Sequence, residues 1–76
     1  MARVLVIQDD REICDLIVLR LLMAGHSVLA ISDAMTALDT VDRVGAPEVY
    51  GIDVGLPDID GFRLLSRLRE LGESTR

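Results

Sequence analysis

The sequence predicts an α/β fold, in which a doubly wound parallel sheet with strand order 2-1-3 is covered by helices. Three observations predict it. Short apolar runs alternate with stretches of helical periodicity, glycine or proline separates several of these segments, and acidic residues follow the first and third runs. In order, the segments are strand, helix, strand, helix, strand and helix. This alternation is typical of right-handed crossovers between parallel strands, and in the order 2-1-3 it makes the first and third strands neighbours.

The first strand is expected over Val4–Ile7, a continuous apolar run of the kind that a strand buried on both faces shows. A helix is expected over 11–23, because its apolar residues fall mostly at helical spacing. Either Asp9 or Asp10 can cap the start of this helix. Gly25 is placed to end it at the C′ position.

The second strand is expected over 27–31, where a short apolar stretch meets a polar turn. Ser32 or Asp33 can cap the helix that follows, which is expected to reach about Val44. The segment Gly45–Pro47 then breaks the helix.

The third strand is expected over Val49–Val54, and the turn after it is rich in Asp, Gly and Pro. Asp58 follows Pro57, and we expect it to make the local backbone hydrogen bonds for which Asp is favoured in turns. Asp60 is expected to cap a third helix that runs over 61–72 and ends at its glycine.

The composition limits the function classes. The chain has 76 residues, so it forms one domain at most, and its single cysteine excludes an internal disulfide. We expect Cys14, Met23 and Met35 in the core. A net charge of −5 disfavours direct nucleic acid binding, and no apolar run is long enough to span a membrane, so a cytoplasmic location is expected.

Acidic residues follow two strands that are predicted to be neighbours. Asp9 and Asp10 come after the first strand, and Asp53 lies at or near the end of the third. Ligands of open α/β sheets bind beyond the carboxyl ends of the strands, so these carboxylates are expected to converge there. Converging carboxylates favour a hard cation such as Mg²⁺, and such a site would suit phosphoryl transfer to a carboxylate nucleophile.

Three stretches carry a resemblance to a known family: VLVIQDD, ISDAMTALD and PEVYGIDVGLPDIDGF. Together they resemble the receiver domain of two-component response regulators, and the resemblance covers essentially the whole chain. It implies a flavodoxin-like (CheY-like) fold. It also implies that residues 1–76 are the N-terminal portion of a receiver domain, truncated after the third helix, with the rest of the fold missing.

The resemblance implies specific roles for residues at the strand ends. Asp53 matches the acceptor of a phosphoryl group from a sensor histidine kinase or phosphotransfer protein, and it also matches a metal ligand. Asp9 matches a direct Mg²⁺ ligand, and the backbone carbonyl of Gly55 matches a third. Gln8 stands where the family carries a first acid. Its amide can accept a hydrogen bond from a metal-bound water but brings no charge, so weaker Mg²⁺ binding is expected.

Two further family features have no counterpart in these 76 residues. They are the switch hydroxyl at the end of the fourth strand and the Lys at the end of the fifth, and the sequence contains no Lys at all. The phosphoryl oxygens would therefore lack a cationic partner, so these residues alone are not expected to be competent. The resemblance implies a signalling module and not an enzyme.

Two alternatives stay open at the level of sequence. A truncated or degenerate receiver could be a protein-interaction module that forms homodimers through the exposed edge of its third strand, because an apolar edge is a template for another strand. A stand-alone Mg²⁺-dependent phosphotransferase or phosphatase would use the same acids. It lacks a candidate general acid or cationic clamp, which disfavours it.

Overall fold

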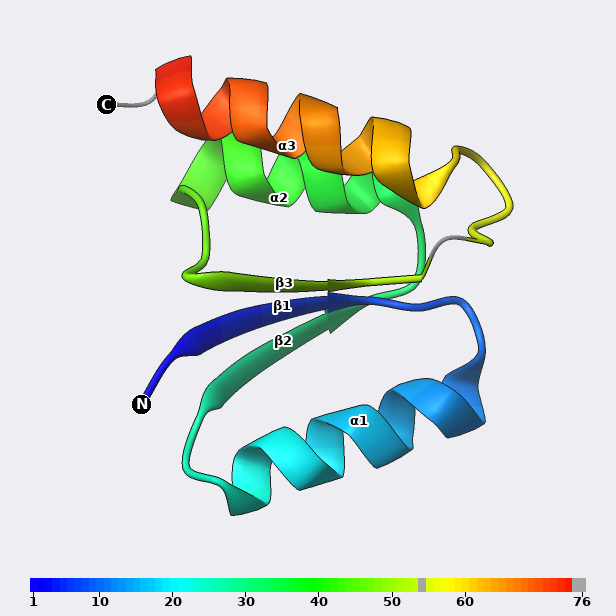
Figure 1. The fold of residues 1–76 in the computed structure, drawn as a ribbon, viewed down its shortest axis with the longest axis vertical. Helices are drawn as coiled ribbons and strands as arrows, with labels where there is room; N and C mark the ends of the chain where they lie inside the picture. The colour runs from blue at the N-terminus through cyan, green and yellow to red at the C-terminus, as the bar shows by residue number, and fades with distance from the viewer. Residues whose placement is uncertain (54, 75–76) are drawn as a thin grey trace.

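The computed structural model describes residues 1–53 and 55–74, and it confirms the predicted order of strands and helices (Figure 1). The three strands form one sheet in the order β2-β1-β3, as the sequence predicts. The elements are β1 (Arg3–Ile7), α1 (Arg11–Met23), β2 (Ser27–Ile31), α2 (Ala34–Val44), β3 (Val49–Ile52) and α3 (Gly61–Ser74).

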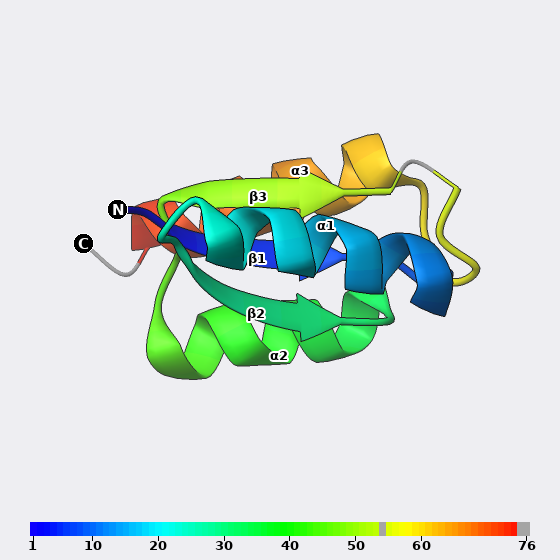
Figure 2. The same ribbon diagram turned by 90° about the horizontal axis from the view of Figure 1, so that it is seen from below.

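All pairing in the sheet is parallel. Ile7 at the end of β1 lies opposite Ile31 of β2 on one side and opposite Ile52 of β3 on the other. The three strands therefore end at the same edge, where the β1–α1 and β3–α3 connections also begin (Figure 2). This edge is the one at which the sequence places the acidic residues.

The helices cover the sheet unequally. Helices α2 and α3 lie together on one face, and α1 lies on the other (Figure 1). The strand β1 is buried on both faces, which explains its uninterrupted apolar sequence. The largest cluster of buried side chains lies between the sheet and the pair α2 and α3: Leu5, Ile7, Ile31, Ala34, Ala37, Val41, Leu56, Leu64 and Leu68.

Aspartates cap two of the helices. Of the candidates for α1, Asp10 is the cap, and its side chain accepts from the backbone N–H of Ile13. Asp33 caps α2 and accepts from the backbone N–H of Thr36 and from its hydroxyl. The backbone bond and then the hydroxyl bond hold the pKa of the Asp33 carboxyl below its ordinary value. Gly25 takes a φ of 90° after α1, as expected for C′.

Two predicted boundaries are wrong. β3 ends at Ile52, so Asp53 follows the strand, and Val54 lies outside the described residues. The helix α3 does not end at Gly72 but continues to Ser74. Leu71 packs against the core, and this contact stabilises the last turn of the helix. A glycine inside a helix lowers the helix stability by only about 1 kcal/mol relative to alanine, so Gly72 does not end it.

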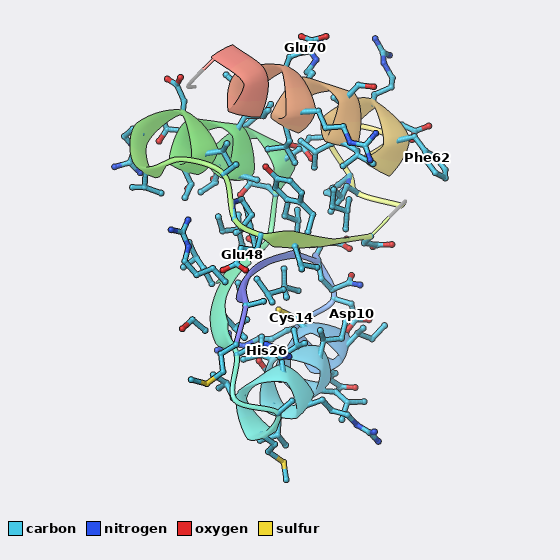
Figure 3. The ribbon with its side chains drawn as sticks, turned by 60° about the vertical axis from the view of Figure 1, so that its left-hand side comes forward. Asp10, Cys14, His26, Glu48, Phe62 and Glu70 are labelled. Carbon is cyan, nitrogen blue, oxygen red and sulfur yellow. The ribbon has the colours of Figure 1, made fainter. Side chains whose placement is uncertain are left out.

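The predicted core positions on the helix surfaces are also wrong. No residue of α1 is fully buried, and Cys14 is half-buried, with its sulfur on the side of the helix toward the sheet (Figure 3). Met23 and Met35 are exposed over 80% and 68% of their surface. Among the described residues, nothing covers the outer side of α1, so its apolar spacing overstates its burial.

The helix α3 offers a direct test of which side chains hold the fold. Leu64 is fully buried in the core, whereas Phe62, two residues earlier, is 72% exposed and projects outward at the start of α3 (Figure 3). Leu64→Ala leaves a cavity and is expected to lower the free energy of unfolding by about 3 kcal/mol. Phe62→Ala is expected to lower it by less than about 0.5 kcal/mol. Urea unfolding of both variants measures the difference, and equal losses would contradict this description of the core.

Candidate functional site at the carboxyl edge of the sheet

The backbone holds the residues after β1 and β3 side by side. The N–H of Asp53 donates to the carbonyl of Ile7 at 2.9 Å, and the N–H of Gln8 donates to the carbonyl of Ile31 at 3.0 Å. The strand pairing thus continues one residue beyond each strand. Gln8 and Asp53 extend neighbouring strands at the same level, and Asp9 follows directly.

The turn between β1 and α1 is ordered by its own side chains. The side-chain oxygen of Gln8 accepts from the backbone N–H of Asp10 at 3.1 Å, and the carboxylate of Asp10 accepts from Ile13 at 3.2 Å. Asp10 is therefore engaged as the helix cap, at the turn labelled in Figure 3. Asp9 is exposed between these two residues, and its carboxylate belongs to the surface of the site.

Asp53 is half-buried and has a defined contact with the next loop. The backbone N–H of Gly55 donates to its Oδ1 at 3.1 Å. A hydrogen bond from a backbone N–H fixes the orientation of the carboxylate. The two residues that the sequence singles out on this loop are therefore in direct contact.

The donor set at this edge consists of oxygen atoms. The donors expected from the sequence are the carboxylates of Asp9 and Asp53, the backbone carbonyl of Gly55 and, through a water, the amide oxygen of Gln8. Across residues 1–53 and 55–74, no group of three or more His, Cys, Asp or Glu side chains is arranged to hold a metal. Mg²⁺ commonly uses only one or two carboxylates and keeps several waters, so these donors fit it, whereas a structural zinc site would need nitrogen or sulfur.

The β3–α3 loop is fixed at several points. Leu56 is only 8% exposed and belongs to the core, and Ile59 packs against the same cluster. Asp60 accepts from the N–H of Phe62 at 2.8 Å, as expected for a residue at the start of α3. Apolar packing therefore holds the loop in its middle, and the Asp60 cap holds it where α3 begins.

The structure does not support local hydrogen bonding for the side chain of Asp58. Its two oxygens accept from the N–H groups of Ala34 and Met35, at 3.3 and 3.2 Å, in the first turn of α2. Those residues lie 24 and 23 positions earlier in the chain. No periodicity or turn signal pairs positions so distant, so this interaction is absent from the sequence-based description.

Tyr50 on β3 is a further residue that the sequence does not single out. Its side chain packs against the core, and burial raises the pKa of its hydroxyl. Within the described part of the chain this buried hydroxyl has no hydrogen-bond partner. It lies on the core side of the sheet and adds no ligand to the carboxyl edge.

Among the helices that the structure describes, none combines the length and the apolar character needed to cross a membrane. The longest is α3, and it carries Arg63, Arg67, Arg69 and Glu70.

Comparison with protein families gives a match over nearly the whole chain. The family described as response regulator receiver domain matches residues 4–76. Among curated proteins, the transcriptional regulatory protein TrcR of Mycobacterium tuberculosis is 37% identical over 68 residues, which are 90% of this chain and 26% of TrcR. The regulatory protein VanRc of Enterococcus gallinarum is also 37% identical over 68 residues, 90% of this chain and 29% of VanRc.

Solved structures show the same fold. The non-phosphorylated HemR receiver domain from Leptospira biflexa superposes with a TM-score of 0.82 at 23% identity, over 96% of this chain and 58% of that one. The N-terminal domain of a response regulator receiver protein from Methanoculleus marisnigri gives a TM-score of 0.80 at 22% identity, over 88% and 54%. The chain thus spans between a quarter and a third of these curated relatives and slightly more than half of the solved chains.

Proposed function

Because this chain belongs to the response regulator receiver domain family, we propose that it accepts a phosphoryl group on Asp53 from a sensor histidine kinase or phosphotransfer protein. The observation that carries the proposal is the position of Asp53. It follows β3 directly, is hydrogen-bonded through its N–H to the end of β1, and extends the sheet beside Gln8. As in other two-component systems, the donor and this chain are expected in the cytoplasm.

The chemistry requires a carboxylate nucleophile with a fixed orientation. A carboxylate oxygen of Asp53 forms a bond to phosphorus as the bond from phosphorus to the donor's imidazole nitrogen breaks. The electron pair of the broken bond stays on that nitrogen, which takes up a proton. The N–H of Gly55 holds the carboxylate in place. The chain acts in this step as an acceptor, so we assign it no enzymatic turnover.

We propose Mg²⁺ as the cofactor, held by Asp9, Asp53 and the carbonyl of Gly55. When bound, it would offset negative charge on the transferring phosphoryl group. Gln8 would contribute through a metal-bound water, because an amide carries no charge. Because Gln8 replaces an acid of the family pattern, the site has one negative charge fewer. This supports the proposal that Mg²⁺ binds weakly here.

Phosphorylation of Asp53 is the first test. Incubation of the protein with Mg²⁺ and acetyl phosphate is expected to add one phosphoryl group, because a small phosphodonor can reach the half-buried acceptor carboxylate at the edge of the sheet. Intact mass spectrometry measures the gain. The variant Asp53→Asn is expected to gain nothing, since an amide oxygen is a much poorer nucleophile than a carboxylate.

The control is Asp42→Asn, an exposed acid near the end of α2 that lies away from the carboxyl edge, where this helix begins, and it is expected to behave as the wild type. An unmodified wild-type protein, or equal modification of Asp53→Asn, would refute the proposed function. Modification is expected to be slow, because these 76 residues contain no Lys to offset the phosphoryl charge.

The identity of residue 8 gives a second test. Gln8→Asp adds a negative charge beside Asp9 and Asp53, and near the surface one such charge is worth about 1 to 2 kcal/mol toward a divalent cation. Mg²⁺ affinity is therefore expected to rise about tenfold, measured by the shift of amide resonances on titration. Gln8→Asn, which adds no charge, serves as the control. An unchanged affinity in Gln8→Asp would place the metal elsewhere.

Association through β3 is a second candidate function, and one observation favours it. β3 is an edge strand of the described sheet, and a groove beside it is lined by Tyr50, Ile52, Phe62 and Leu65. An exposed edge with apolar surroundings can pair with a second copy of the chain.

The net charge of −5 supports protein partners over direct contact of this chain with nucleic acid.

Light scattering coupled to size exclusion decides this point. If β3 mediates homodimers, the molar mass is expected to double as concentration rises, and Val49→Lys, which places a charge on the edge strand, is expected to restore the monomer. The matched control Leu29→Lys changes an exposed residue on β2, at the opposite edge. A monomer at every concentration would exclude this candidate.

A further inference from the structure

We propose that Asp58 is a positioning residue for the chemistry at Asp53. In this inference, its carboxylate ties the β3–α3 loop to the first turn of α2 and thereby holds Gly55 against the acceptor carboxylate. It rests on the proposed function of Asp53, and it adds a residue whose role lies outside the donor set at the carboxyl edge.

The contacts of Asp58 use both of its side-chain oxygens. Oδ1 accepts from the N–H of Ala34 at 3.3 Å, and Oδ2 accepts from the N–H of Met35 at 3.2 Å. These N–H groups belong to the first turn of α2, where they have no partner within the helix. The positive end of the helix dipole favours a carboxylate at this place. Asp58 thus makes a two-point connection between the loop and a helix.

The connection matters because of where it falls in the loop. Gly55 contacts Asp53 at one end of this segment, through the 3.1 Å bond from its N–H to Oδ1. Leu56, next to Gly55, is buried in the core, and Asp58 follows two residues later. The path of Gly55 past Asp53 is therefore set by Leu56 from inside the protein and by Asp58 from α2. Loss of the Asp58 connection removes the tie between the loop and α2, and leaves Leu56 as the anchor next to Gly55.

A purely structural role for Asp58 would have a different signature. Asp33 caps the same helix, since its carboxylate accepts from Thr36, but these side-chain hydrogen bonds stay within the first turn of α2 and do not reach the β3–α3 loop. Removing either carboxylate weakens the start of α2. Only removal of Asp58 also releases the loop. The pair Asp58→Ala and Asp33→Ala therefore separates positioning from stability.

The first measurement needs no phosphodonor. Hydrogen exchange of backbone amides is followed by NMR in the wild-type protein and in both variants. Asp58→Ala is expected to speed the exchange of the Gly55 amide about tenfold, because its hydrogen bond to Asp53 opens more often. Asp33→Ala is expected to leave Gly55 within about twofold of the wild type while it speeds exchange at Thr36. Equal rates at Gly55 in the two variants would overturn the inference.

The second measurement is the rate of phosphorylation of Asp53 by acetyl phosphate. Asp58→Ala is expected to slow it about tenfold, because small displacements of positioning groups have effects of this size or larger. Each protein is measured at the same number of degrees below its own melting temperature. Under these conditions Asp33→Ala is expected to keep the wild-type rate. Asp58→Asn keeps an oxygen that can accept one of the two N–H bonds, so a partial recovery of the rate is expected.

The outcomes distinguish this inference from the proposed function. A wild-type protein that gains no phosphoryl group refutes the function of Asp53, whereas the exchange of the Gly55 amide still tests what Asp58 does. A wild-type rate in Asp58→Ala refutes the positioning role alone. If Asp58→Ala does not fold, Asp58→Asn carries both measurements, and a wild-type value in both of them overturns the inference.

Discussion

The central position of β1 is the constraint on which the rest of the structure depends. β1 pairs with β2 on one side and β3 on the other, and its side chains are buried on both faces of the sheet. Its last residue, Ile7, lies opposite Ile31 and Ile52, and the carbonyl of Ile7 then receives the N–H of Asp53. One strand thus organises the core and also brings together two acidic segments that are more than forty residues apart in the chain.

The alternation of strands and helices could be predicted because it follows from local patterns, and the strand order because doubly wound sheets of this kind place the first strand between the second and third. The helix caps Asp10 and Asp33 could also be predicted as candidates, since a cap is a local interaction. The end of α3 was not, because packing of Leu71 outweighs the local tendency of Gly72 to end a helix. The exposure of Met23 was missed because helical spacing identifies an apolar face without saying what covers it.

The site residues also divide into those whose positions the sequence could predict and those whose contacts it could not. The placement of the segments that carry Asp9 and Asp53 at one edge of the sheet could be predicted from topology, because parallel strands end at the same edge. The hydrogen bonds of Gln8 and Asp58 could not, since each depends on which backbone N–H group lies nearby in the folded chain. Asp58 is the clearer case. Its sequence context is that of a turn, and its partners are set by where α2 begins relative to the β3–α3 loop.

Unequal covering of the sheet also has a consequence for the order in which the chain loses structure. The pair α2 and α3 shares a buried cluster with β1, whereas α1 has no fully buried residue in the described chain. Elements with few buried apolar contacts open at the lowest free energy, as separate cooperative units. In the described chain α1 is therefore the first such unit to open. The turn that carries Asp9 would lose its order with it, so any ion that binds Asp9, as proposed for Mg²⁺, would also stabilise the folded form of α1.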